Sequence, residues 1–317
     1  MIPYEVVVLA GGDSSEREIS IKTGSQVYEA TKTLGLESEL IIVDTFNDVL
    51  NLQFKDNTYV FLGLHGGFGE DGRVQAFLSG KGIPFNGADY VASGISMNKA
   101  LTKYIACAIG IDYPNYFLLK SYEVKEKDFE FLSNKLGIPI IVKPVSQGCS
   151  KGVHLVENEK QFKDAVTKVK QFKETILVEE FIKGQEITVG LLDGEILPII
   201  DIVNESTIFD YYAKFTPGYT SYRQTTLSLQ TQEKVKKISL ELFQRLGIRD
   251  YGRIDFIVND QGTPYLLEIN TLPGLNQHSC YPKACYFRGI SYEQMINIII
   301  EASIRNHVSN KNSRCLS

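Results

Sequence analysis

Apolar runs and amphipathic stretches alternate through the first third of the chain. Four short runs have the length and composition of buried strands: Glu5–Leu9, Leu40–Val43, Tyr59–Leu64 and Ile83–Asn86. A helical stripe follows the first run, at Ile19, Thr23, Val27, Ala30 and Leu34. Ser15 and Glu18 match a capping box at the start of this helix. The alternation predicts a doubly wound parallel sheet, an α/β unit over residues 1–95.

The pattern changes after residue 95, where strands and helices no longer alternate regularly. Helices are predicted over Met97–Gly110, Lys127–Leu136 and Glu159–Gln171. Strands are predicted over Tyr116–Lys120, Pro139–Pro144, Val153–Val156 and Thr175–Glu180. Together these elements predict a small α+β unit over residues 96–182.

Residues 183–317 contain two predicted hairpins. One pairs Glu186–Leu192 with Ile196–Ile202, and the other pairs Arg253–Val258 with Pro264–Ile269. Between them, a polar and aromatic loop over residues 203–226 lacks periodicity and precedes a predicted helix over Gln232–Leu246. Loops of this length are usually lids or disordered segments, and the aromatic side chains favour a lid that closes over a site.

The second hairpin carries two carboxylates and an amide. Glu268 and Asn270 are two residues apart on a strand, so they point to one face, which Asp255 on the partner strand can reach. Oxygen donors of this kind suit Mg²⁺ shared with phosphate. Acids facing solvent are the alternative, but Glu268 lies in an apolar run where an unpaired carboxylate would be costly. The pattern therefore favours a metal site.

Glycine-rich loops follow several of the predicted strands. Two of them, residues 11–17 and 65–72, lie at the carboxyl ends of parallel strands, where ligands bind in such sheets. Neither the first loop nor its surroundings form a dinucleotide fingerprint, and Glu16 by itself is explained by the helix dipole. A third loop, Val145–Gly152, follows Lys143 and would let backbone N–H groups approach a phosphate; an ordinary hairpin turn is the alternative.

Length, charge and cysteine content limit the class of protein. A chain of 317 residues is long enough for two or three domains. Its net charge of -5 argues against general binding to nucleic acid or to an anionic membrane. Five cysteines without a C-x-x-C pair argue against a zinc ribbon or a disulfide framework and for a reducing compartment. No run approaches a membrane span, and Val6–Ala10 is too short for a signal peptide, which predicts a cytoplasmic protein.

Eight motifs follow one another through the chain: Leu9–Ser20 (LAGGDSSEREIS), Leu64–Gly72 (LHGGFGEDG), Ser96–Lys99 (SMNK), Ile141–Pro144 (IVKP), Phe209–Phe215 (FDYYAKF), Gly252–Phe256 (GRIDF), Leu266–Gly274 (LLEINTLPG) and His278-Ser279. Each is weak alone, but their order and spacing are consistent from Glu5 to about Glu301. In these motifs the chain resembles the D-alanine–D-alanine ligase family of the ATP-grasp superfamily. The resemblance implies an ATP-grasp fold of three domains, with ATP between the second and third, and a homodimer, which is usual for the family.

The resemblance also implies which residues bind ATP and its metal. Lys99 and Lys143 would neutralise the phosphates, Ser150 and Lys214 would also contact ATP, Glu179, Phe181 and Ile182 would hold adenine, and Glu186 would bind the ribose. Asp255, Glu268 and Asn270 match the ligands of Mg²⁺, for which Mn²⁺ can substitute. This assignment agrees with the metal site expected from the hairpin alone.

The reaction implied by the resemblance has two halves. One D-alanine carboxylate attacks the γ-phosphate to give an acyl phosphate, and the amine of a second D-alanine then displaces phosphate. Glu16 would hold the first ammonium, which replaces its explanation by the helix dipole. Arg253 and the backbone N–H of Gly274 would form the oxyanion hole. Ser279 and Cys280 would receive the second substrate's carboxylate, and His65 would orient the first substrate or serve only as a structural loop residue.

Three positions depart from the family pattern. Cys149 and Phe215 stand where the family has a serine and a tyrosine linked to the glutamate, so the network around Glu16 would contain Cys149 and lack both hydroxyls. Cys280 stands in place of a leucine. Three functions stay open: a D-alanine–D-alanine ligase for peptidoglycan precursors, a ligase with another acceptor such as D-lactate or a different amino acid, and a catalytically silent nucleotide-binding protein. The last is disfavoured because the phosphate and metal residues are all present.

Overall fold

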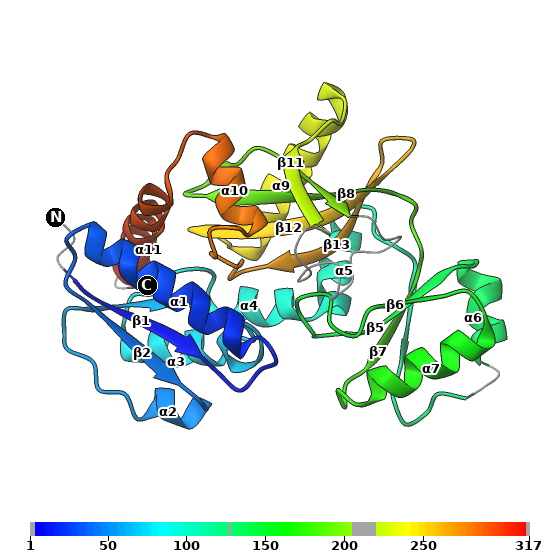
Figure 1. Ribbon diagram of the computed structural model, residues 1–317, viewed down its shortest axis with the longest axis horizontal. Coiled ribbons are helices and arrows are strands. Elements are labelled where there is room, and N and C mark those ends of the chain that lie inside the picture. Colours follow the sequence, from blue (N-terminus) through cyan, green and yellow to red (C-terminus); the bar gives the residue numbers. More distant parts are fainter. Residues whose placement is uncertain (1–3, 126–127, 205–219, 315–317) are drawn as a thin grey trace.

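The computed structural model describes residues 4–125, 128–204 and 220–314. Its strands form a three-stranded, a four-stranded and a six-stranded sheet. The first two lie at opposite ends of the long axis, and the six-stranded sheet lies between them (Figure 1). Parallel and antiparallel sheets are thus combined with helices, which confirms the predicted mixture of α/β and α+β architecture.

The three-stranded sheet is parallel, as predicted. β1 (Glu5–Gly11) is its central strand and pairs with β2 (Ser38–Val43) and β3 (Thr58–Leu62). Four helical segments accompany it: α1 (Arg17–Thr33), α2 (Phe46–Leu50), a 3₁₀ helix (Gly67–Gly69) and α3 (Arg73–Lys81). In Figure 1, α1 crosses in front of this sheet and α3 lies behind it. The loops after β1 and β3 therefore open at the same edge.

The fourth strand predicted at Ile83–Asn86 is wrong, because the segment makes only one parallel bridge, between Val60 and Phe85. The side chain of Asn86 makes hydrogen bonds to the backbone of β3 in place of the backbone hydrogen bonds that a fourth strand would make. Its Oδ1 accepts from the backbone N–H of Leu62 at 2.5 Å, and its Nδ2 donates to Leu62 O at 3.3 Å and to the Tyr251 hydroxyl at 2.9 Å. A side chain thus links this sheet to the C-terminal part of the chain.

The start of α1 also differs from the prediction. The helix begins at Arg17 behind Glu16, and Ser15 and Glu18 do not form a capping box. Ser14 is the residue that orders this turn, since its Oγ accepts from Glu16 N at 3.1 Å and donates to His65 O at 2.7 Å. The two glycine-rich loops are thereby tied together at Glu16.

The middle of the chain forms the four-stranded antiparallel sheet, in the order β4-β7-β5-β6. Its elements are β4 (Tyr116–Leu119), α6 (Asp128–Leu136), β5 (Ile140–Pro144), β6 (His154–Val156), α7 (Glu159–Lys170) and β7 (Ile176–Glu180). The helix predicted over Met97–Gly110 is present as α5 (Lys99–Ala108), and it is preceded by a helix that was not predicted, α4 (Tyr90–Met97). They meet at Asn98, whose side chain accepts from Ala100 N and Leu101 N and so begins the second helix.

The six-stranded sheet contains the remaining strands. These are β8 (Gly184–Leu192), β9 (Glu195–Ile196), β10 (Ile200–Asn204), β11 (Thr220–Gln224), β12 (Tyr251–Asn259) and β13 (Pro264–Asn270). The helices α9 (Leu229–Leu246) and α10 (Cys280–Phe287) pack on this sheet, and α11 (Tyr292–Arg314) packs against α1 and α10. The predicted lid loop over residues 203–226 is wrong at both ends, because β10 and β11 pair antiparallel there. Residues 205–219 of that loop lie outside the described residues.

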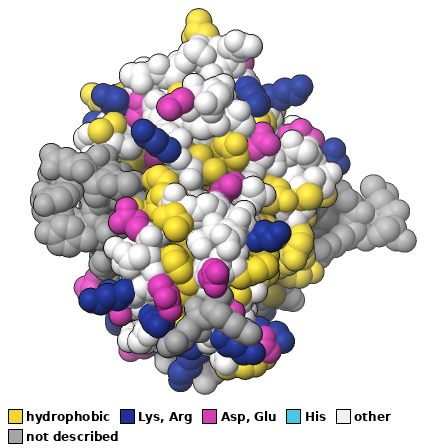
Figure 2. Space-filling model, turned by 90° about the vertical axis from the view of Figure 1, so that its right-hand side faces the viewer, with side chains coloured by type: hydrophobic (Ala, Val, Ile, Leu, Met, Phe, Trp, Pro, Cys, Tyr) yellow, Lys and Arg dark blue, Asp and Glu magenta, His cyan; other side chains and the backbone are white. Residues whose placement is uncertain are grey.

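Two hydrophobic cores show how the parts are held together. The largest combines residues from both ends of the chain, among them Val8, Phe61, Tyr251, Met295 and Ile299. The four-stranded sheet has a separate core, which includes Leu132, Val142, Phe162 and Val178. The end of the molecule with this small sheet faces the viewer in Figure 2, where basic and acidic side chains are interspersed with apolar ones. The charge on that face is therefore mixed.

Candidate active site

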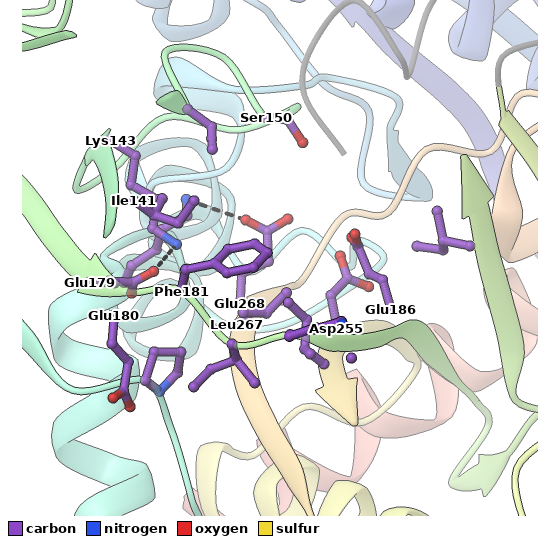
Figure 3. Close-up of a pocket in the computed structure, with 18 of the residues that line it drawn as sticks. Ile141, Lys143, Ser150, Glu179, Glu180, Phe181, Glu186, Asp255, Leu267 and Glu268 are labelled. Carbon is purple, nitrogen blue, oxygen red and sulfur yellow. Dashed lines mark ion pairs between the residues drawn. The ribbon is translucent and has the colours of Figure 1, made fainter. Parts of the chain in front are cut away.

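A cavity of about 560 Å³ lies between the four-stranded sheet and strands β8, β10, β12 and β13. The predicted site residues that line it are Lys99, Lys143, Ser150, Glu179, Phe181, Ile182, Glu186, Asp255 and Glu268. In Figure 3 most of the labelled charged side chains point into one space from both sheets, whereas Glu180 points away from it. A volume of this size is typical of pockets for a nucleotide-sized ligand. Lys214 lies outside the described residues.

Apolar side chains line one part of the cavity. Ile141 of β5 and Phe181 after β7 come from the small sheet, and Ile257 and Leu267 come from β12 and β13. Leu267 is placed there by a bulge, since Asp255 pairs with Glu268 while the next residue, Phe256, pairs with Leu266. The extra residue lets adjacent side chains face the same space. This arrangement gives a flat ring such as adenine two apolar walls.

Lysines form the cationic part of the site. Lys143 Nζ lies 2.6 Å from Glu179 Oε2, and Figure 3 marks this ion pair. Lys99 Nζ donates to the backbone carbonyl of Gln147 at 2.7 Å and lies 3.3 Å from Glu268 Oε2. Each lysine is thus paired with an acid at the edge of the cavity.

The loop between β5 and β6 lies at the edge of the cavity, and its predicted role at a phosphate stays a prediction. The strands pair antiparallel, so the loop is a hairpin connection, and Ser150 also lines the cavity. Cys149 and Ser150 have φ angles of 51° and 55°, and Lys151 N donates to Gly148 O at 3.0 Å. These features define a type I′ turn, which places two non-glycine residues in the left-handed region. Glu174 holds the loop by accepting from Ser146 N at 2.9 Å.

The carboxylates predicted to bind metal lie side by side in the sheet. Asp255 of β12 is the cross-strand partner of Glu268 of β13, and Arg253 is the partner of Asn270. Asp255 is buried and accepts from Thr188 Oγ1 at 2.6 Å. Asn270 Oδ1 accepts from Leu272 N at 3.1 Å. Two carboxylates and an amide oxygen on one face are donors of the kind that Mg²⁺ prefers, so these residues fit that metal.

Arg253 is the positive centre of this group. Its Nε and Nη2 lie 2.9 and 2.8 Å from the two Asp255 oxygens, and Nη2 lies 3.7 Å from Glu268 Oε1. Burial alone would lower the pKa of Arg253, but the charge of Asp255 raises it above its usual value. Arg253 Nη1 also lies 3.7 Å from Cys280 Sγ. The structure therefore joins the metal residues to the start of α10.

The segment before α10 brings two further predicted residues together. Ser279 is the N-cap of α10, and a side-chain atom added at Gly274 would lie 3.5 Å from Ser279 Oγ. Cys280 follows at the first turn of the helix and is buried. Gly274, Ser279 and Cys280 thus form one corner near Arg253.

Glu16 lies where the N-terminal loops meet the loop between β5 and β6. Its side chain is buried, and Cys149 Sγ contacts Glu16 Oε2. His65 is buried nearby, with Nδ1 at 3.6 Å from Glu70 Oε1 and Nε2 at 3.0 Å from Thr23 Oγ1. Burial raises the pKa of the Glu70 carboxyl, and the charge of Glu16 acts in the same direction. The predicted contact of Glu16 with position 149 is present, whereas Phe215 lies outside the described residues.

Three residues of the site were not predicted from the sequence. Glu70 holds His65, Thr188 holds Asp255, and Lys103 Nζ lies 2.8 Å from Glu179 Oε1. Glu70 lies in one of the quoted motifs, so its position was available as a signal. Lys103 is one helical turn from Lys99, which places both on one face of α5.

Known proteins were compared with the chain. The family model described as D-ala D-ala ligase C-terminus matches residues 105–301. The D-alanine–D-alanine ligase of Aquifex aeolicus is 38% identical over 296 residues, 93% of this chain and 99% of that protein. That of Bacillus anthracis is 38% identical over 300 residues, 94% of this chain and 96% of that protein. The crystal structure of the Bacillus anthracis ligase complexed with ATP superposes with a TM-score of 0.82 at 36% identity, over 97% of this chain and 99% of that chain. The chain belongs to the D-alanine–D-alanine ligase family.

Proposed function

We infer that the protein is an ATP-dependent ligase that joins two D-alanine molecules through an acyl phosphate, for the synthesis of peptidoglycan precursors. One observation carries this inference: Lys99, Lys143 and the carboxylates of Asp255 and Glu268 converge at one nucleotide-sized cavity, and Arg253 lies behind it, paired with Asp255. Phosphoryl transfer depends on positioning and charge neutralisation, which is what such a set of side chains provides.

ATP is proposed to lie between the two antiparallel sheets. Adenine would lie between the apolar walls, against Phe181 and Ile182 and the backbone at Glu179, and Glu186 would accept from the ribose hydroxyls. Lys99, Lys143, Ser150 and Lys214 would lie along the phosphates, with Asp255, Glu268 and Asn270 holding Mg²⁺ or Mn²⁺. The bound metal would supply positive charge to the phosphate oxygens.

The amino acids are proposed to react next to Arg253. Glu16 would hold the ammonium of the first D-alanine, and His65, itself fixed by Glu70, would orient that substrate. The guanidinium of Arg253 and the N–H of Gly274 would stabilise the oxyanion that forms when the second amine attacks. Ser279 and Cys280 would receive the second carboxylate.

A different acceptor is the second candidate function. The contact between Cys149 and Glu16 supports it, because a thiol is a weaker hydrogen-bond donor than the family's serine hydroxyl. A weakly linked Glu16 would assist deprotonation of an amine less well and would favour an acceptor such as D-lactate. A catalytically silent protein is disfavoured by the complete set of phosphate and metal residues.

We also propose a cellular location and an oligomeric state for the protein. A cytoplasmic location is supported by the absence of disulfides at Cys107, Cys149, Cys280 and Cys285. A homodimer rests on the family resemblance. Among the described residues, no helix combines the length and the apolar character needed to cross a membrane.

The test measures phosphate release from ATP and Mg²⁺ with D-alanine, followed by mass spectrometry of the products. D-Alanine should stimulate phosphate release, and the dipeptide should be the main product in a panel of D- and L-amino and hydroxy acids. The matched control is Glu268→Gln, which keeps the side-chain shape but removes a charge. Hydrolysis that is independent of every acceptor would refute the ligase assignment, and a product from another acceptor would favour the second candidate.

A further inference from the structure

Lys103 is a buried cation behind the nucleotide cavity. Its side chain is 0% exposed, and it is absent from the residues that line the cavity. Its Nζ lies 5.6 and 5.7 Å from the ring centroids of Tyr113 and Tyr116. Such a lysine cannot contact a ligand in the cavity directly, so any influence on a ligand must pass through another side chain.

Glu179 is that side chain, because two lysines share its carboxylate. Lys103 Nζ lies 2.8 Å from Oε1, and Lys143 Nζ lies 2.6 Å from Oε2. Both contacts are ion pairs at short range, so each lysine stabilises the carboxylate through its charge. Burial alone would raise the pKa of Glu179, but the charges of Lys103 and Lys143 lower it. The carboxylate therefore stays ionised although it is almost completely buried.

The two lysines differ in what else they can reach. Lys143 borders the cavity, and Figure 3 shows its ammonium between Glu179 and the open space. A triphosphate in the cavity would compete with Glu179 for that ammonium. If Lys143 left Glu179 and no other cation were present, a buried carboxylate would remain unpaired, which is strongly unfavourable. A second cation removes this penalty.

We propose that Lys103 is a positioning residue for nucleotide binding, which keeps Glu179 neutralised when Lys143 turns from that carboxylate to the nucleotide phosphates. The inference rests on the proposed function, in which Lys143 binds ATP phosphates. Without Lys103, Lys143 is the cation that remains beside Glu179 in this trio. Lys143 then stays paired with Glu179 and does not turn to the phosphates. The phosphates then lose a ligand although the cavity itself is intact.

A double-mutant cycle tests this exchange of partners. Lys103→Met should raise the Kd of a non-hydrolysable ATP analogue, measured by calorimetry with Mg²⁺, about 10–100-fold. The Kd of adenosine, which has no phosphates, should stay within about twofold of the wild-type value. Adding Glu179→Gln to Lys103→Met should return the analogue's Kd to within about threefold of that of Glu179→Gln alone, because a neutral amide no longer retains Lys143.

Three controls separate this role from a structural one. Lys160→Met removes a charge from the exposed face of α7 and should leave both Kd values unchanged. Thermal unfolding without ligand identifies a variant that fails to fold, and Lys103→Gln then replaces it. Equal weakening of the analogue and adenosine, no weakening of either, or no recovery in the double variant would overturn the role of Lys103. A wild-type protein that binds no nucleotide would overturn the proposed function and this inference together.

Discussion

Replacing Arg253 with methionine would remove the positive charge from the centre of the site while keeping most of the side-chain length. The guanidinium lies 2.9 and 2.8 Å from the two Asp255 oxygens and 3.7 Å from Glu268 Oε1. Arg253→Met therefore has two separable effects. It removes the proposed oxyanion donor, and it leaves two carboxylates with less compensation.

The size of each effect follows from the kind of contact that is lost. Loss of one preorganised donor should lower kcat about 10²–10³-fold, which is about 3–4 kcal/mol of transition-state stabilisation. Asp255 would keep Thr188 Oγ1 at 2.6 Å but lose its ion pair, and breaking a buried pair costs about 3–5 kcal/mol of unfolding free energy. Added Mg²⁺ should restore part of the second loss, because it supplies positive charge beside Asp255.

Three measurements distinguish these effects: single-turnover rates with D-alanine, ATP affinity by calorimetry, and chemical unfolding with and without Mg²⁺. Arg245→Met on the exposed side of α9 is the matched control, since its guanidinium lies 3.5 Å from Glu241 in solvent. ATP affinity should fall much less than the single-turnover rate. A collapse of ATP affinity with a normal single-turnover rate would show that Arg253 is a nucleotide ligand and that the reasoning is wrong.

Three further changes test other parts of the protein. Glu268→Gln or Asp255→Asn should lower kcat by orders of magnitude with the fold intact, because each removes a charge from the proposed metal site; near wild-type turnover with an unchanged Mg²⁺ requirement would count against it. Burial raises the pKa of Asp250 to about 6, so the protonated form is favoured in the folded state and stability should fall as the pH rises from about 4 to about 6. Asp250→Asn should remove this fall and gain up to about 3 kcal/mol of unfolding free energy at neutral pH, and parallel curves for the two proteins would contradict the assignment. Phe215→Tyr with Cys149→Ser should shift the pH optimum of dipeptide formation downward and reduce the amount of ester product. The check is the partition of product between D-alanine and D-lactate from about pH 6 to about pH 9. Identical partition curves for the two proteins would exclude these positions as determinants of acceptor choice.

Periodicity predicted the parts of the site that depend on neighbouring strands. The pattern in Arg253–Val258 and Pro264–Ile269 predicted that Asp255 can reach the face of Glu268, and the strand register confirms it by pairing the two residues directly. The bulge at Leu267 was not predictable, because it depends on how the two strands pack. The place of Lys103 at the site was not predictable, since its partner Glu179 is brought to it by a strand far along the chain.

Where the predictions failed, a side chain replaced a backbone hydrogen bond. Asn86 pairs with Leu62 through its amide, so an apolar run that reads as a strand makes only one bridge. The helix α4 was not predicted, and Asn98 separates it from α5 because its side chain caps the start of α5. Asparagine competes with regular structure in this way wherever its side chain can reach the backbone. The domain limits at residues 95 and 182 stay predictions, as do the roles of the residues at the cavity.

The core that joins both ends of the chain has a consequence for how the family can diversify. Val8 and Ile299 pack in the same interior as Tyr251, which lies two residues before Arg253 on β12. Arg253, which is proposed to act on the amino acids, is therefore supported by the core that joins both ends of the chain. Lys143 and Glu179 belong to the four-stranded sheet, which has a separate hydrophobic core. The parts of the protein around these two cores meet at the site, because Cys149 of the small sheet's loop contacts Glu16 and Asp255 joins Arg253 to the nucleotide cavity. A mutation that changes acceptor choice at either contact would therefore also alter the surroundings of the nucleotide, whereas a mutation in the interior of one core would not.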